Sequence, residues 1–252
     1  SSTNASSAIL SGLVLKGHIF TIIKIFYRVF GLEVIHLLRM DNVIFILGLL
    51  AMIMGSVHAL RQNNVKRMIA WSSVAQVGYI FLGVGLNTIA GIAAACLHII
   101  VHACIKPMLF TAAGGLSNAA GHKKGLHALM GTFYVNQWAG LGLAVGAFSM
   151  MGIPGFAGFA SKLSLTLASF DSPVIIWSLA ALAASSVLNA LYYVPAVIVI
   201  LTHHKDAHKN FTAPAPTILY KISMGIFIAI NFYLGLFCVP LLRLITRGVN
   251  VL

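Results

Sequence analysis

Long apolar runs, separated by short polar connections, make up most of this chain. About 20 residues of helix cross the hydrocarbon core of a bilayer, and each run approaches or exceeds that length. The pattern predicts seven spans, at residues 8–30, 42–59, 68–86, 89–116, 138–170, 173–201 and 218–244. Because most connections are short, neighbouring spans run antiparallel. The expected fold class is an all-α, polytopic bundle of transmembrane helices.

The fifth predicted span contains a sequence that a continuous helix does not tolerate. Pro154 lacks a backbone donor and clashes with the preceding turn, and the neighbouring glycines Gly152, Gly155 and Gly158 remove the remaining stiffness. We expect a discontinuous helix around residues 152–158. Transporters place such breaks at their ion sites, where the exposed backbone lies against protein or water.

The fourth predicted span carries three ionisable residues, His98, His102 and Lys106, spaced four residues apart. This spacing puts them on one stripe of a helix, about 12 Å from end to end. Pro107 follows directly and would free the carbonyl of Ala103 for water. Ionisable groups inside a membrane are costly, so the stripe indicates a proton relay. The alternatives are polar core residues, or a metal site, which the neighbouring lysine and the lack of a carboxylate disfavour.

Two further lysines lie inside predicted spans. Lys16 stands about 12 Å in from Ala8, too deep for its stem to reach the interface easily. Lys162 follows the fifth-span break by four residues. A lysine in apolar surroundings holds its proton less tightly than one in water, which suits proton transfer.

Composition agrees with a membrane protein: 60% of residues are hydrophobic, only 8% are charged, and the mean hydropathy is +0.97. The 16 basic residues face four acids, all at span ends or in connections: Glu33, Asp41, Asp171 and Asp206. Lysines inside the spans therefore lack a carboxylate partner in this chain, although buried charges are normally paired. We expect the partner in another subunit or in more of the same polypeptide. The basic residues are scattered over connections, which argues against nucleic acid.

The connections differ in charge on the two sides of the membrane. If each span crosses the membrane in turn, the larger set of basic residues lies on one side. These residues are Arg61, Lys66, Arg67, Lys123, Lys124, Lys205, Lys209 and Lys221. Fewer arginines lie on the other side, so the positive-inside rule makes the first side, with Ser1, cytoplasmic. The loop with His203, His204 and His208 is interpreted as solvated rather than metal-binding. The chain lacks an initiating Met and a signal peptide, and we expect it to be truncated at its start.

Four stretches resemble one known family. They are SAILSGLVLKGHIF around Lys16, LRQNNVKRMIAWSSVAQVGYIFLG from Leu60, HIIVHACIKPMLF from His98 and MGIPGFAGFASKL from Met151. They are similar to the antiporter-like, proton-translocating membrane subunits of NADH-quinone oxidoreductase (complex I), membrane-bound hydrogenases and multisubunit cation/proton antiporters, whose D-type subunits are included. The resemblance covers nearly the whole chain.

The resemblance implies a domain organisation and a set of site residues. Family members have about fourteen helices with two inverted five-helix repeats, so residues 1–41 would end the first repeat, 42–201 would form the second, and 202–252 would be a loop and final span. Lys16 matches the central lysine, His98, His102 and Lys106 match a polar axis, and Lys162 matches the lysine of the exit half-channel. The first repeat, with its glutamate and lysine pair, is absent. Some quinone-reductase subunits carry a glutamate at the position of Lys162.

We therefore expect a subunit that moves protons along a buried Lys/His/water axis, with other subunits and membrane lipid as partners and with exchange of Na⁺ or K⁺ left open. The expected location is the inner membrane of a bacterial or archaeal cell. No Walker, GxGxxG, Ser-His-Asp or haem-binding motif is present in the sequence, so we expect no catalytic residue, cofactor or metal of its own. Membership of an oxidoreductase complex stays open. One alternative is a structural or assembly subunit without an ion path. Another is an intramembrane enzyme using His98 or Cys104, which is disfavoured because Cys104 and His102, two residues apart, face away from each other on a helix.

Overall fold

The computed structural model describes residues 4–202 and 215–249, and within these ranges the regular structure is helical. The predicted His-rich loop at residues 203–209 lies outside the described part. The helices are α1 (Asn4–Ile9), η1 (Leu10–Val14), α2 (Leu15–Lys24), η2 (Ile25–Phe30), α3 (Gly31–Leu37), α4 (Met40–Leu60), α5 (Val65–Gly85), α6 (Ile89–Ala119), η3 (His127–Leu129), α7 (Thr132–Val135), α8 (Gln137–Met151), α9 (Ala157–Ser169), α10 (Ile175–Leu201), α12 (Ile218–Leu236) and α13 (Cys238–Val249).

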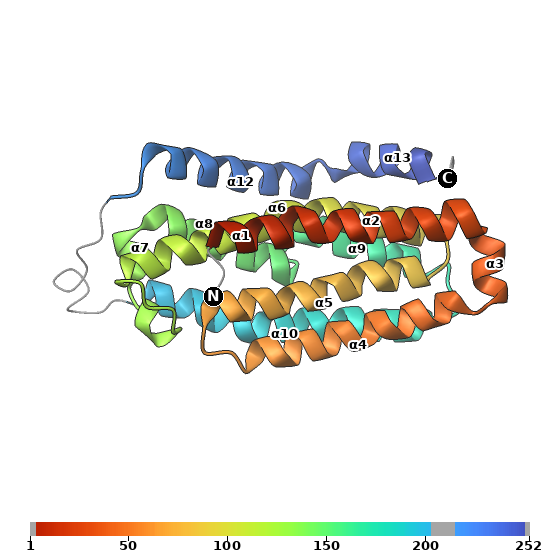
Figure 1. Ribbon diagram of the computed structural model, residues 1–252, viewed down its shortest axis with the longest axis horizontal. Coiled ribbons are helices and arrows are strands. Elements are labelled where there is room, and N and C mark those ends of the chain that lie inside the picture. Colours follow the sequence, from red (N-terminus) through yellow and green to blue (C-terminus); the bar gives the residue numbers. More distant parts are fainter. Residues whose placement is uncertain (1–3, 203–214, 250–252) are drawn as a thin grey trace.

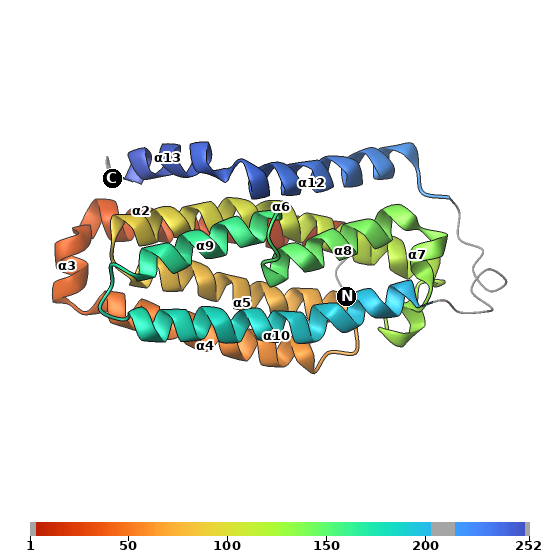
Figure 2. The same cartoon turned by 180° about the vertical axis from the view of Figure 1, so that it is seen from behind.

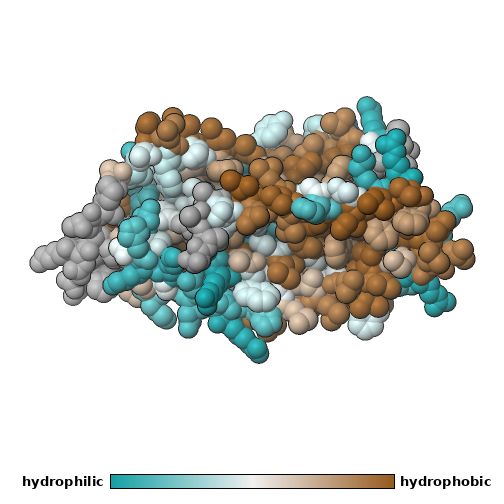
Figure 3. Space-filling view, in the orientation of Figure 1, coloured by the Kyte–Doolittle hydropathy of each residue, from teal (hydrophilic) through white to brown (hydrophobic). Residues whose placement is uncertain are grey.

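The long helices lie side by side in an elongated bundle, as the all-α prediction requires (Figure 1). Six helical stretches among the described residues are long and apolar enough to cross a membrane. The helices α8 and α9 lie end to end and form the predicted discontinuous span (Figure 2). Apolar side chains cover most of the middle of the surface, while hydrophilic ones gather towards the two ends (Figure 3). The molecule is an integral membrane protein.

The first span is less regular than predicted. Its helical stretch, Ser6–Leu37, includes the two π-helical segments η1 and η2, and it turns at Gly31, whose φ is 78°, so that α3 leaves the line of α2 just after the predicted end at Phe30 (Figure 1). The span packs closely on α6 at Gly12, where an added Cβ would lie 2.6 Å from Cγ of Pro107. Pro107 itself lies inside a continuous α6. Glycine at position 12 thus lets the two helices meet at the proline ring.

The last span differs from the prediction of one helix over residues 218–244. The helix α12 ends at Leu236 and α13 begins at Cys238. Pro240 explains the interruption, because its ring clashes with the carbonyl four residues earlier, which belongs to Leu236. A proline in the first turn of α13 is tolerated, since that position has no helical partner for an N–H.

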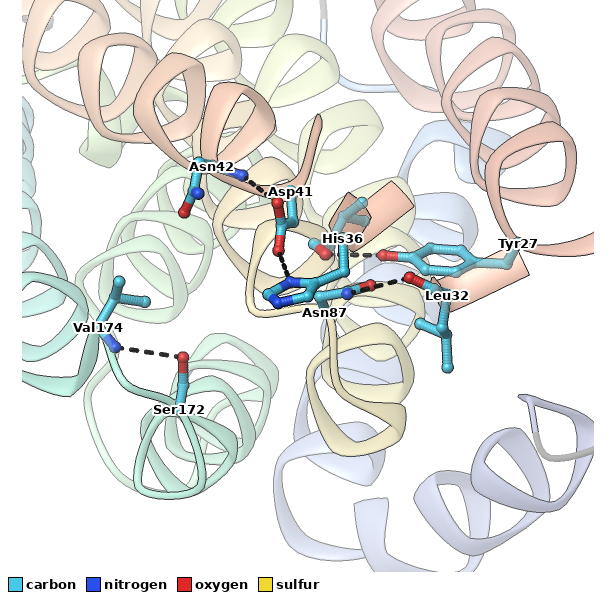
Figure 4. Close-up of polar contacts among 9 residues, drawn as sticks. Tyr27, Leu32, His36, Asp41, Asn42, Asn87, Ser172 and Val174 are labelled. Atoms are coloured by element: carbon cyan, nitrogen blue, oxygen red, sulfur yellow. Dashed lines mark hydrogen bonds and ion pairs between the residues drawn. The ribbon is translucent and has the colours of Figure 1, made fainter. Parts of the chain in front are cut away.

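Polar contacts fasten the end of the bundle where α3 meets α4 (Figure 4). The hydroxyl of Tyr27 donates to the carbonyl of Val84 at 2.7 Å, which ties the first span to α5. The buried carboxylate of Asp41 lies 2.8 Å from Nδ1 of His36. The opposite end carries the basic residues of the α4–α5 and α6–α8 connections.

Candidate functional site

The helix α6 lies in the centre of the bundle, and most of its residues are buried. Four-residue spacing places His98, His102 and Lys106 along one line of this helix. Lys16 comes from the first span and Lys162 from α9. All five side chains are at most 8% exposed.

A hydrogen-bonded network connects Lys16 with Lys106. Lys16 donates to the carbonyl of Ser11, whose hydroxyl lies 3.0 Å from that of Ser73. The hydroxyl of Ser73 donates to the carbonyl of Ile69 at 3.2 Å, and Lys106 donates to the same carbonyl at 2.8 Å. The two lysines, 90 positions apart in sequence (106 minus 16), therefore share one cluster of polar groups.

The same network continues from Lys106 into α10. Its ammonium donates to the hydroxyl of Ser72 at 2.6 Å, and that hydroxyl lies 2.9 Å from the hydroxyl of Tyr193. Lys106 is 0% exposed, so these contacts replace the water it would have at a surface.

A cavity of about 710 Å³ leads from the basic end of the bundle towards this cluster. Ser7, Leu10, Ser11 and Leu15 line one side, which follows the first span inwards for about 12 Å. The remaining lining residues come from α5, α6 and the following connection, and are Asn64, Lys66, Arg67, Ala70, Ser73, Phe110 and Lys124. The cavity thus has a basic mouth and reaches the Ser11–Ser73 hydroxyl pair.

The two histidines lie along α6 between the lysine network and the helix break. Their rings lie parallel, with centroids 6.1 Å apart, and the ring of Tyr79 stacks on His98 at 5.3 Å. Nδ1 of His98 lies 3.0 Å from the hydroxyl of Ser161, one residue before Lys162. Within the described residues neither ring nitrogen of His102 has a hydrogen-bond partner, nor does Nε2 of His98.

The broken span ends α8 with a left-handed glycine. Gly152, at φ 88°, donates its N–H to the carbonyls of Phe148 and Ser149, which closes the helix. The ammonium of Lys162 then binds the carbonyls of Met150 and Met151 at 2.8 and 3.2 Å. The lysine therefore satisfies the carbonyls that the end of a helix leaves without partners.

The start of α9 is completed by neighbouring helices. The N–H of Ala157 donates to Oδ1 of Asn231 in α12 at 3.2 Å, and the N–H of Gly158 donates to Oγ of Ser149 at 2.9 Å. The ring of Phe232 packs on Phe156 with centroids 4.9 Å apart. The helix α12 thus covers the non-helical backbone, as irregular structure at membrane depth requires.

Carboxylates and metal ligands are not part of this arrangement. Among the described acids only Asp41 is buried, at the α3–α4 end, and no carboxylate in residues 4–202 and 215–249 pairs with Lys16, Lys106 or Lys162. The same ranges contain no group of three His, Cys, Asp or Glu residues that could hold a metal ion.

Several polar residues of the site were not predicted. They are Ser11, Ser72, Ser73, Tyr79, Ser161, Ser186, Asn189 and Tyr193. The residues in α5 did carry a usable pattern, because Ser72, Gln76 and Tyr79 recur at helical spacing on one face of an apolar span. Ser186 and Asn189 in α10 are similarly spaced.

The fold and site define a class: a polytopic membrane protein with a broken helix beside a buried line of basic residues. Residues 1–188 match the family described as NADH:quinone oxidoreductase/Mrp antiporter, TM. This match covers well over half of the sequence, and the chain belongs to that family.

Individual relatives agree. The chain is 31% identical over 199 residues to NADH-quinone oxidoreductase subunit N of Geotalea uraniireducens, covering 79% of this chain and 42% of the relative. It is 33% identical over 181 residues to the D-type subunit of the Na⁺/H⁺ antiporter of Alkalihalophilus pseudofirmus, covering 71% and 36%. A chain of the membrane-bound sulfane sulfur reductase, an archaeal respiratory membrane complex, superimposes with a TM-score of 0.85 at 26% identity, covering 99% of this chain and 49% of the other. The chain thus spans less than half the length of these proteins.

Proposed function

We propose that this chain is part of a subunit that translocates protons through the membrane along the buried Lys/His/water axis, within a multisubunit respiratory or antiporter complex. The observation that carries the proposal is the line of buried polar groups from Lys16 through Lys106, His102 and His98 to Lys162. The names of the relatives, which include a quinone oxidoreductase subunit and a cation/proton antiporter subunit, support it.

Each part of the line has a role in the proposed transfer. Lys16 and Lys106 hold the proton near the cavity, and Lys162 passes it on at the helix break. The histidines between them lack partners for three of their ring nitrogens among the described residues, although buried polar atoms are normally hydrogen-bonded. A water bridging these nitrogens would complete the connection.

Electrostatic repulsion couples neighbouring sites along the line. Two unit charges 10 Å apart repel by about 1.7 kcal/mol at an effective dielectric of 20, which changes an equilibrium constant by roughly tenfold or more. A proton on Lys16 therefore disfavours a second positive charge further along the line. Filling one site helps to empty the next, and the partner complex supplies the energy.

The arrangement in the membrane is part of the proposal. The basic end with the cavity mouth would face the cytoplasm of a bacterial or archaeal cell, together with the start of this chain, by the positive-inside rule. Residues 42–201 would form one five-helix repeat, with 1–41 and 202–252 as flanking segments. The lysines then depend on carboxylates from outside the chain for compensation of their charge.

The test replaces Lys16 in the full-length protein within its native complex. Lys16→Met keeps most of the side-chain volume and removes the titratable group, so proton uptake into proteoliposomes should be abolished while subunit content on blots stays near wild type. Lys16→Arg should also fail, because a guanidinium does not release its proton. Lys24→Met is the matched control, since Lys24 is exposed on the same helix, and it should pump normally.

Two results would contradict the proposal. Full proton uptake by Lys16→Met would exclude Lys16 from the path. Loss of the assembled complex as the sole effect of this substitution would favour a structural or assembly role.

A further inference from the structure

Three oxygens converge on the ammonium group of Lys162. They are the carbonyl oxygens of Met150 and Met151, at 2.8 and 3.2 Å, and Oγ of Ser186 in α10, at 3.1 Å. An ammonium has three N–H donors, and these contacts account for all of them. The ring of Tyr79 lies 4.9 Å from the nitrogen and presents its face to the charge. We call these three oxygens and the aromatic ring the oxygen cage.

The chemistry of the cage fits a cation with a single charge. Two of its oxygens end the half-helix α8, where the helix dipole concentrates negative partial charge. All three are uncharged, and none of the acids in the described ranges contacts Lys162. A divalent ion such as Ca²⁺ takes six to eight oxygens with carboxylates among them, whereas carbonyls at the ends of broken helices coordinate monovalent ions in transporters.

The backbone of the break is shaped around this position. Gly152 adopts φ 88°, and a Cβ at that residue would lie 3.0 Å from Cδ of Lys162. Asn189 donates from Nδ2 to the carbonyl of Met150 at 3.3 Å, which helps to fix the direction of that carbonyl. The carbonyl of Met150 is therefore held in place by a group other than the ammonium that it binds.

We propose that the oxygen cage is a binding site for a monovalent cation of about the size of ammonium or K⁺, and that the protonated side chain of Lys162 competes with this cation for it. Binding of the cation would require the nitrogen of Lys162 to leave the cage, and loss of its proton favours this because the three oxygens then no longer hold a charge there. The cage would thereby couple one cation to one proton at a single place. The cation site itself does not depend on the proposed function. Only the coupling of the bound cation to a translocated proton rests on it.

A simpler explanation is that Lys162 only caps α8, as basic side chains near the end of a helix often do. A cap stabilises the helix end but gives the cage no preference for a free ion. Removal of the amine separates the two explanations, because a true site would then accept an ion from solution.

The experiment measures the thermal stability of Lys162→Ala in the full-length protein within its native complex. Melting curves are recorded in choline, Na⁺, K⁺ and ammonium chlorides at equal ionic strength. Without the amine, ammonium or K⁺ at about one hundred times its Kd should raise the Tm by roughly 5 to 10 °C over choline. Wild type, whose cage is filled by Lys162, should differ between these salts by less than about 2 °C.

Lys106→Ala is the matched control. Lys106 is buried like Lys162, but its ammonium binds one carbonyl and one hydroxyl within the continuous helix α5, far from the carbonyl end of that helix at Gly85. Its melting should not depend on which monovalent cation is present. Adding Ser186→Ala to Lys162→Ala should weaken the cation response, since one ligand is removed.

The proposal is overturned if Lys162→Ala melts identically in choline and in every cation, or if Lys106→Ala shows the same response. If Lys162→Ala does not accumulate, Lys162→Met takes its place, because its apolar side chain keeps most of the stem's packing and removes the ammonium donor from the three oxygens. A melting temperature independent of the cation there also overturns the proposal. Proton pumping by Lys16→Met would contradict the relay and leave the cation site standing, so the two hypotheses fail separately.

Discussion

Gly158→Ala tests whether the broken span depends on close contact between its two halves. An added Cβ at Gly158 would collide with the carbonyl oxygen of Ser149 and lie 2.7 Å from the carbonyl carbon and 3.2 Å from Oγ of the same residue. The first two atoms belong to the backbone of the last turn of α8 and cannot rotate away. The two half-helices would have to move apart.

The size of the effect follows from three contributions. Overpacking of this kind costs about 1 to 3 kcal/mol. The displaced α9 also loses the bond from its Gly158 N–H to Oγ of Ser149, at about 1 kcal/mol. The higher helix propensity of alanine returns about 1 kcal/mol. The net loss of about 1 to 3 kcal/mol should lower the Tm by roughly 3 to 10 °C.

The assay follows exposure of buried cysteine thiols to a fluorescent maleimide during heating of the purified complex. Cys96 is 8% exposed and reports unfolding of the core. Gly17→Ala is the control, because nothing lies within 4 Å of a Cβ there and the residue is exposed on α2. Its Tm should stay the same or rise. Equal melting of the two variants would refute the argument that α8 and α9 are in contact at Gly158.

Two other predictions concern the cavity and the cover of the break. A membrane-impermeant thiol reagent added from the basic side should modify Ser73→Cys, because Ser73 lines the cavity. It should leave Ser72→Cys unmodified, because Ser72 faces Lys106. Equal labelling of both variants would contradict the cavity. Asn231→Leu should lower the free energy of unfolding by about 1 to 3 kcal/mol, since the buried N–H of Ala157 loses its acceptor. An unchanged Tm would show that α12 is not needed to satisfy the backbone at the start of α9.

The parts of the fold that local chemistry decides were predictable from sequence. Pro154 and its glycines act within one turn, so the break was confirmed where it was expected. The interruption at Phe237 was missed although Pro240 signals it, because the span was assigned from hydropathy and apolar residues continue through the break. The π-helical segments of the first span carry no pattern that distinguishes them from an α-helix.

The site, like the fold, could be predicted only in part from the sequence. Helical spacing was sufficient to align His98, His102 and Lys106 along α6. Their partners depend on how distant helices pack, as in the contact of Ser72 with Tyr193, 121 positions away, and that of His98 with Ser161, 63 positions away. Hydroxyl groups are also common in apolar spans without any role, so only the packed structure identifies those that matter.

The π-helical segment η1 has a consequence for how this region can change in evolution. It ends at Val14, two positions before Lys16, and a turn closed by i to i+5 bonds holds one more residue than an α-helical turn. Deleting one residue from η1 would let the helix revert to regular α-geometry at little cost in backbone bonding. The residues on either side would keep nearly the same face, because the wide turn absorbs its extra residue. A single-residue deletion here is therefore expected to be tolerated better than one in the regular part of the span, where it would rotate the preceding residues by about 100° relative to Lys16.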